Sequence, residues 1–262
     1  MRRGLILAAW PLLLSCGGAD DAAGPTLEVV SDQITFKSVE SLGAHHMLAT
    51  VSRTDLWDDG GQDDHEETAE LAWNNWDSFH MRRVVNGATL SEIIVEEGRA
   101  YSRSKGSGWQ TEIDAEPARL QVQTTWNVWA TAMDLFSGRV QYTEGETSVV
   151  DGRPARRFAV VLSPLAQGQR IRSGSMTPVS IEGEVWLDEG TAVRLSANVR
   201  ATATRKGLSR TIHIHLRRSG VGQAQTITPP AAPVRSPGEI LRQRAQRPTR
   251  NAPRSPARAG KP

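Results

Sequence analysis

Cysteine is nearly absent from this chain, with Cys16 the only one among 262 residues. No disulfide can therefore form within the chain, so its core must hold without covalent cross-links. Several catalytic signatures are missing as well: there is no Gly-x-Ser-x-Gly elbow, no His-Glu-x-x-His, no phosphate loop and no Gly-x-Gly-x-x-Gly. These absences predict a protein that is not an enzyme and that carries no cofactor.

Long apolar runs are also lacking. The run from Leu5 to Leu14 is well short of the roughly 20 residues that a membrane-spanning helix needs. It follows Arg2 and Arg3 and ends in small residues, as secretory signal peptides do. Residues 1–15 are therefore expected to be a signal peptide.

Cys16 stands directly after Leu13-Leu14-Ser15, and this tetrapeptide resembles the lipobox of bacterial lipoproteins. The resemblance implies that the Cys16 thiol is acylated and anchors the protein to a membrane of the bacterial envelope, facing the periplasm. Gly17 stands where an Asp would mark retention at the inner membrane in enteric bacteria, so the outer membrane is favoured. Residues 16–25 then form a flexible tether. A cleaved secretory peptide and an uncleaved N-terminal anchor are the alternatives.

The C-terminal segment Pro229–Pro262 differs in composition from the rest. It holds eight of the 14 prolines, eight basic residues, one acidic residue and no aromatic side chain. Such a segment cannot bury enough apolar surface to fold, so a disordered tail is expected. Residues 4–228 have a net charge of −7, against +7 for the tail. In an exported protein, anionic envelope polymers are more plausible partners for this tail than nucleic acid, and a solvated extension without a partner is the plainer alternative.

The body, residues 26–228, is expected to be mainly antiparallel β-structure with a few helices. From Val193 to Thr204 apolar and polar residues alternate, which predicts one long half-buried strand. Asp151-Gly152 is typical of a tight hairpin turn. About ten strands joined by short links favour a meander. The expected strands lie near His46–Leu56, Glu67–Trp73, Phe79–Asn86, Leu90–Glu96, Ala100–Ser104, Glu146–Val150, Arg156–Ser163, Ser180–Asp188, Val193–Thr204 and Leu208–Leu216.

One segment, Pro117–Phe136, breaks the strand period. Five of its apolar side chains recur at steps of three and four, which places them on one stripe of a helix that Gly138 can end. These residues are Val122, Trp126, Trp129, Met133 and Phe136. Such a stripe must cover an apolar surface. A second segment, Thr26–Leu42, fits a short helix or a strand.

No metal site is expected. The acidic segment Asp58–Glu67 lacks the alternate spacing of an EF-hand, so it is interpreted as a solvated hairpin tip, with a Ca²⁺ site as the alternative. His213 and His215 share one face of a strand, as two zinc ligands would, but no third ligand is near them in the sequence.

A one-sided antiparallel sheet with an aromatic helix to lie across it resembles the LolA/LolB-like superfamily of periplasmic lipoprotein carriers, which includes mycobacterial lipoproteins with the same half-barrel fold. The resemblance covers roughly residues 26–220 and is one of layout, with paired strands, a tryptophan hairpin, a helical lid and further strands in the same order. The matching pieces are Phe79–Val85, Ile93–Ser102, Gly108-Trp109, the helix, Val150–Phe158 and Val185–Asp188.

The resemblance implies a curved sheet, an incomplete β-barrel, closed by the aromatic-rich helix over a hydrophobic cavity that receives acyl chains. Its expected lining comprises Val122, Trp126, Trp129, Met133, Phe136 and Trp109. Wide, adaptable apolar walls suit acyl chains, although each of these side chains also fits a plain core position. The expected function is the binding of lipid or lipoprotein acyl chains by a membrane-anchored lipoprotein. Transport of lipids or lipoproteins in the envelope is the process that such binding could serve. The alternative is a solid envelope adaptor that binds peptidoglycan or a partner protein through its basic tail.

Overall fold

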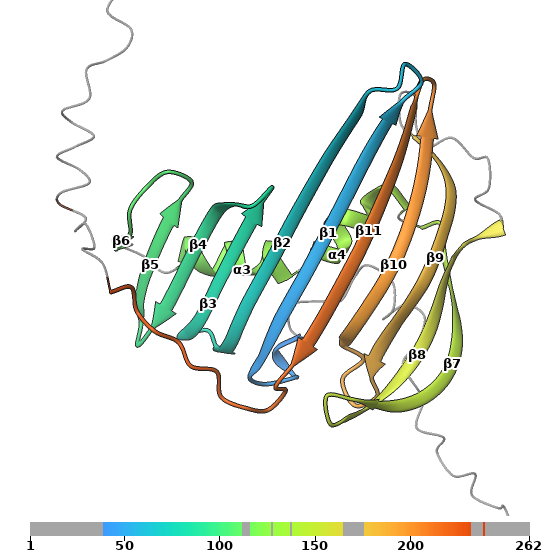
Figure 1. Cartoon of the computed structure of the whole chain (residues 1–262). Helices are drawn as coiled ribbons and strands as arrows, with labels where there is room; N and C mark the ends of the chain where they lie inside the picture. Colours follow the sequence, from blue (N-terminus) through green and yellow to red (C-terminus); the bar gives the residue numbers. More distant parts are fainter. Residues whose placement is uncertain are drawn as a thin grey trace, which may run out of the picture.

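A computed structural model describes residues 39–111, 116–126, 128–136, 138–164, 176–231 and 238. They form one open antiparallel sheet of 11 strands with short helices over one face (Figure 1). The strands are β1 (His45–Trp57), β2 (Gln62–Asn75), β3 (Ser78–Val85), β4 (Ala88–Glu96), β5 (Arg99–Ser104), β6 (Gln110–Thr111), β7 (Val140–Val150), β8 (Arg153–Leu162), β9 (Thr177–Asp188), β10 (Arg194–Arg205) and β11 (Leu208–Ser219). The predicted mainly β fold with an incomplete barrel is confirmed.

The order of the strands in space is β6-β5-β4-β3-β2-β1-β11-β10-β9-β8-β7. Each half of the chain is thus a meander of neighbouring hairpins, as the short links between strands predict. The two meanders join where the first strand pairs with the last, with Ala49 opposite Leu216. The edges of the sheet are therefore β6 and β7, which are consecutive in sequence but lie on opposite sides.

The chain between these two edges must cross a face of the sheet, and it does so as helices. This crossing consists of α3 (Glu116–Trp126), α4 (Val128–Met133) and the short 3-10 helix η1 (Asp134–Phe136). Pro117 occupies the first turn of α3, where a missing N–H does no harm. Gly138 follows η1 with φ +68°, and the predicted stop at this residue is confirmed. The described residues of the predicted Pro117–Phe136 helix are helical, and the segment ends as the 3-10 helix η1.

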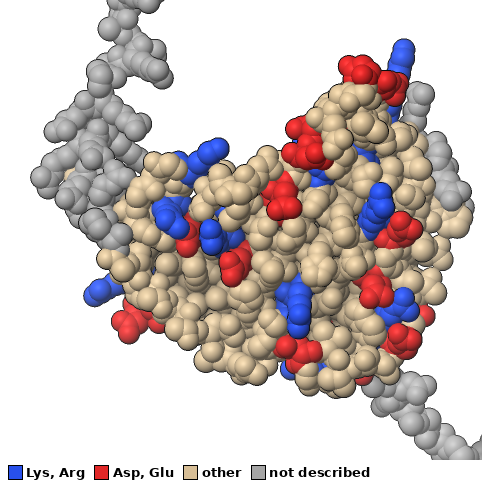
Figure 2. Space-filling model, viewed as in Figure 1, with Lys and Arg blue, Asp and Glu red and all other residues tan. Residues whose placement is uncertain are grey.

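Alternation along the strands sets the core, as the sequence predicts. Every second residue from Val193 to Ala203 is buried, with exposed fractions of 0–1%. These side chains face the helices, together with Met47, Leu71 and Phe158 from other strands. From Ser196 to Thr204 their polar neighbours lie on the opposite face, where acidic and basic side chains are interspersed (Figure 2). The result is a sheet with one apolar face covered by the crossing helices.

The long β1–β2 hairpin continues further than predicted. The turn itself comprises only residues 58–61, while β2 already begins at Gln62. Asp63 lies opposite Asp55, and the Thr54 hydroxyl donates a hydrogen bond to Asp64 Oδ1 at 2.7 Å. Asp64 thus has a hydroxyl partner on β1, and Asp63, although it faces another acid, lies 3.7 Å from the Arg53 guanidinium. The interpretation of all these acids as a solvated tip was therefore too broad.

Several predictions fall outside the described residues. They are the signal peptide, Cys16 and its tether, most of Thr26–Leu42, and nearly all of the basic tail. Within the described part, no helix is long and apolar enough to cross a membrane. Nor does any group of three or more His, Cys, Asp or Glu side chains among the described residues have the geometry to hold a metal ion. His213 is exposed, and its Nε2 lies 2.8 Å from Asn198 Oδ1.

Candidate functional site

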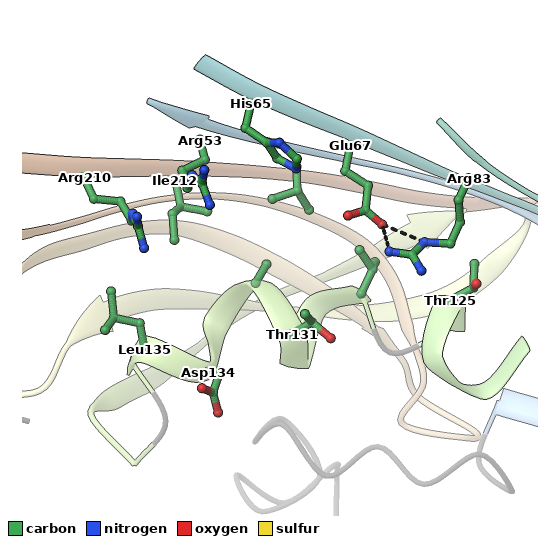
Figure 3. A pocket seen from close by; sticks show the side chains of 13 residues that line it. Arg53, His65, Glu67, Arg83, Thr125, Thr131, Asp134, Leu135, Arg210 and Ile212 are labelled. Carbon is green, nitrogen blue, oxygen red and sulfur yellow. Dashed lines mark hydrogen bonds and ion pairs between the residues drawn. The ribbon is translucent and has the colours of Figure 1, made fainter. Parts of the chain in front are cut away.

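A cavity of about 370 Å³ lies between the helical crossing and the centre of the sheet (Figure 3). Strands β1, β2, β3 and β11 form one wall, and residues from the end of α3 through η1 form the other. The lining residues are Val51, Arg53, His65, Glu67, Arg83, Thr125, Val128, Thr131, Ala132, Asp134, Leu135, Arg210 and Ile212. The volume lies at the lower end of the roughly 300–1,000 Å³ that is typical of ligand pockets.

Both walls of the cavity contribute apolar side chains. Val51 and Ile212 come from neighbouring strands of the sheet, and Val128, Ala132 and Leu135 come from the helical segment. The aliphatic groups thus face one another across the space, an arrangement that suits a hydrocarbon chain. Their burial by such a chain would be favourable by about 25 cal/mol per Å² of apolar surface removed from water.

The sheet wall also carries a polar belt, which we define as Arg53, His65, Glu67, Arg83 and Arg210. These residues come from β1, β2, β3 and β11 and project toward α4 in Figure 3. The period of two along each strand explains their direction, because they continue the same inner face as the core side chains. On β1, for instance, Met47, Ala49 and Val51 are followed on that face by Arg53 and Asp55.

Two of the three arginines in the belt are held in ion pairs. Arg210 donates to both oxygens of Asp55, at 2.7 Å from Nε and 2.6 Å from Nη2. These hydrogen bonds, with the nearby positive charge, hold the pKa of Asp55 below its usual value despite the burial of the carboxylate. Arg83 donates to Glu67 Oε1, at 2.8 Å from Nε and 2.5 Å from Nη2. The two acids are thereby neutralised.

Arg53 is held much more loosely. Its Nε is 3.8 Å from Asp55 Oδ2 and its Nη2 is 3.7 Å from Asp63 Oδ2, both beyond hydrogen-bond distance. Its Nε is also buried and has no hydrogen-bond partner among the described residues. His65 lies directly opposite Arg53 in the β1–β2 ladder. This pair therefore faces the cavity with donors to offer a ligand.

The predicted lining residues lie elsewhere in the same region. Val122, Trp129, Met133 and Phe136 are buried at 0–1% exposure in the core, and none of them is among the residues that line this cavity. The ring of Trp129 stacks against Arg194, whose Cζ is 4.1 Å from the ring centroid. Ligand contact by these four side chains stays a prediction.

Of the remaining predicted residues only Trp109 has a described side chain, and it does not line this cavity. Trp126 ends α3, and its side chain lies outside the described part of the structure. Trp109 is half-buried beneath Arg103, whose Cζ is 4.8 Å from its ring centroid. Cys16 lies outside the described residues. The polar belt, in contrast, was missed, although continuing the strand alternation past Val51 would have placed Arg53 on the inner face.

Comparison with known proteins gives matches among solved structures only. No protein-family model matches the chain, and no curated protein matches it. LprF from Mycobacterium bovis is 14% identical, with 80% of this chain and 100% of that chain covered and a TM-score of 0.31. A LolA superfamily protein from Nitrosomonas europaea is 10% identical, with coverage of 74% and 94% and a TM-score of 0.22.

A third match is a putative outer membrane lipoprotein-sorting protein domain from Vibrio parahaemolyticus. It is 9% identical, with 74% of this chain and 92% of that chain covered and a TM-score of 0.23. At these identities and TM-scores the matches say nothing about a ligand.

Proposed function

We propose that this protein is a lipid-binding lipoprotein of the bacterial envelope, which holds an acyl chain in the cavity between α4 and the sheet. The observation that carries the proposal is the cavity itself, because aliphatic side chains line it from both walls. Val51 and Ile212 would contact one side of the chain, and Ala132 and Leu135 the other.

Binding rather than catalysis is the role we propose. The described lining of the cavity contains no serine or cysteine that could serve as a nucleophile. Two carboxylates near the centre of the sheet are already paired with arginines. Glu67, which lines the cavity, accepts from Arg83, and Asp55, which does not, accepts from Arg210. A carboxylate held in such an ion pair is a poor general base, because the pairing favours its ionised, hydrogen-bonded state.

Attachment to a membrane through Cys16 is the second part of the proposal. It rests on the lipobox resemblance of Leu13–Cys16 and places the cavity domain in the periplasm. Growth of an expressing bacterium with radiolabelled palmitate tests it directly. The full chain should incorporate label, and Cys16→Ser should not. Equal labelling of the two chains would contradict the anchor while leaving the cavity unaffected.

The cavity is tested with the full chain carrying Cys16→Ser, which has no thiol that could be acylated. The protein is incubated with vesicles of phosphatidylethanolamine, phosphatidylglycerol and cardiolipin, re-isolated without detergent, and extracted for mass spectrometry of bound lipid. We expect the wild-type cavity to retain lipid and Ala132→Trp, which fills it from α4, to retain little.

Val149→Trp is the matched control for this experiment. Val149 is 69% exposed on the edge strand β7, away from the cavity lining, so an indole there should leave lipid retention unchanged. Folded wild-type protein that re-isolates without lipid would overturn the proposal. Equal retention by Ala132→Trp would locate the lipid outside this cavity.

A further inference from the structure

The polar belt carries charged groups that the binding of a hydrocarbon chain does not require. Aliphatic side chains suffice to enclose an acyl chain, and buried charges oppose its binding because they must lose water. Yet three guanidinium groups and one imidazole from four strands face the space. Two of the guanidinium groups are engaged by carboxylates, whereas Arg53 and His65 are not engaged in this way.

Arg53 has two carboxylates nearby, but both contacts are long ion pairs and neither is a short hydrogen bond. Asp55, the nearest carboxylate, already accepts two short hydrogen bonds from Arg210, so only its longer 3.8 Å approach is left for Arg53. Asp63 approaches to 3.7 Å, but its side chain is 59% exposed, and solvent weakens such contacts. The Nε of Arg53 is buried without a hydrogen-bond partner.

One further acid lines the cavity from the helical side. Asp134 begins η1, is exposed, and in Figure 3 its carboxylate points away from the strands. It therefore does not neutralise Arg53. His65, the cross-strand neighbour of Arg53, makes no hydrogen bond or ion pair within the described part of the chain.

We propose that Arg53, with His65 beside it, binds the anionic head of a single-chain or multi-chain amphiphile whose hydrocarbon lies against Val51, Ile212 and Leu135. The inference deepens the proposed function and rests on it. A guanidinium fork fits a carboxylate or a phosphate through two parallel hydrogen bonds. The head could therefore be the carboxylate of a fatty acid or the phosphate of a phospholipid.

The test uses soluble amphiphiles that share one chain length and differ in the head. They are dodecanoate, dodecyl phosphate, dodecyl maltoside as the neutral form and dodecyltrimethylammonium as the cation. Each is titrated below its micelle concentration into the full chain carrying Cys16→Ser, and heat of binding gives the dissociation constant. We expect at least one anion to bind at least about tenfold more tightly than the neutral and cationic probes. The anion that binds more tightly shows whether the site prefers a carboxylate or a phosphate head.

Variants then assign the preference to Arg53. Arg53→Gln should weaken the binding of the preferred anion by about tenfold, equivalent to roughly 1.4 kcal/mol. Binding of the neutral probe should not change. Arg53→Lys should fall between, because it keeps the charge and loses the fork. Arg217→Gln, which removes an exposed guanidinium from the opposite face of β11, is the matched control and should bind like the wild type.

The outcomes separate the two proposals. Neutral and anionic probes that bind equally, or an anion preference that survives Arg53→Gln, would overturn the inference and leave the lipid cavity standing. Absence of binding by every probe to folded wild-type protein would overturn both. Circular dichroism of each variant shows that a loss of binding is not a loss of fold.

Discussion

Arg210 and Asp55 join the last strand of the sheet to the first through two hydrogen bonds of 2.7 and 2.6 Å, although 155 residues separate them. They lie directly opposite each other in the β1–β11 ladder, at the junction of the two meanders. Arg210 also lines the cavity, and its hydrogen bonds engage one of the two carboxylates near Arg53. One ion pair thus contributes both to joining the two meanders and to the charge of the binding surface.

Asp55→Asn should therefore destabilise the fold. The Asp55 side chain is only 5% exposed, so the change leaves Arg210 without its anion in a partly buried position. We expect a loss of about 2–4 kcal/mol in the free energy of unfolding, measured with urea at pH 7. Asp58→Asn in the exposed turn is the control and should change stability by less than about 0.5 kcal/mol.

The same pair gives an acid-sensitive contribution to stability. Because the pKa of Asp55 is lower in the folded than in the unfolded chain, its stabilisation is present above the unfolded pKa and is lost as the pH falls through the folded pKa. Asp55→Asn should remove that part of the acid dependence. An unchanged difference between wild type and variant from pH 7 down to pH 2 would contradict the assignment.

The core and cavity residues of the crossing segment should respond differently to substitution. Met133 is fully buried, so Met133→Ala should reduce the free energy of unfolding by about 2–5 kcal/mol through the void it leaves. Ala132 faces the cavity, so Ala132→Trp should block lipid without a comparable loss of stability. Urea unfolding and lipid titration on the same two proteins check this. Weakened binding in a fully folded Met133→Ala would instead favour the predicted contact between this stripe and the ligand.

His45 should make stability fall in mild acid. Its ring is buried, and desolvation, together with the charge of Arg218, lowers its pKa from 6.5 to about 4. The unfolded chain thus binds a proton between pH 6.5 and 4 that the folded chain does not, and the free energy of unfolding should decrease by up to about 3 kcal/mol across that window.

A His45→Gln variant checks the source of this effect through unfolding curves taken at several pH values. Its side-chain amide can still donate to the Gly43 carbonyl, which accepts from His45 Nδ1 at 2.8 Å. The free energy of unfolding of this variant should no longer fall steeply between pH 6.5 and 4. That of His46→Gln, on the opposite face of β1, should still do so. An equally steep fall in the free energy of unfolding of His45→Gln and of the wild type would refute the role of this ring.

Gly183 should tolerate no side chain. It lies in β9 with φ +146°, and a Cβ there would stand 2.2 Å from the carbonyl oxygen of Asn198 and 2.7 Å from Val199 Cα. Both contacts are with the backbone of β10, which cannot move without breaking the ladder. Gly183→Ala should cost more than about 3 kcal/mol or prevent folding. Gly145→Ala, where the nearest atom is 3.5 Å away, should be nearly neutral, and thermal unfolding compares the two.

Strand existence was predictable from the sequence because alternation is a local signal. The alternation from Val193 to Ala203 gave the inner face of β10 correctly, since the helices bury one side of the sheet only. Strand ends were less predictable. Asp64 accepts a hydrogen bond from Thr54 on β1, and Asp63, which faces Asp55, is approached diagonally by Arg53. These contacts are set by the partner strand rather than by the local sequence.

The site was harder to predict than the fold. The stripe of Trp129, Met133 and Phe136 correctly marked a helical segment that covers the sheet, yet burial alone does not distinguish a core side chain from a cavity wall. The space opens instead beside Val128 at the start of α4 and Leu135 within η1. That position depends on how three short elements cross the sheet, which no single periodicity encodes.

The most direct test of the lipid cavity is a crystal structure of the Cys16→Ser chain with a dodecanoate that carries bromine at the end of its hydrocarbon. Anomalous scattering then locates the bromine without reference to the shape of the density. We predict bromine between the sheet and α4, beside Val51, Ile212 and Leu135. Bromine found only on the outside of the sheet, with the cavity empty at saturating ligand, would contradict the account.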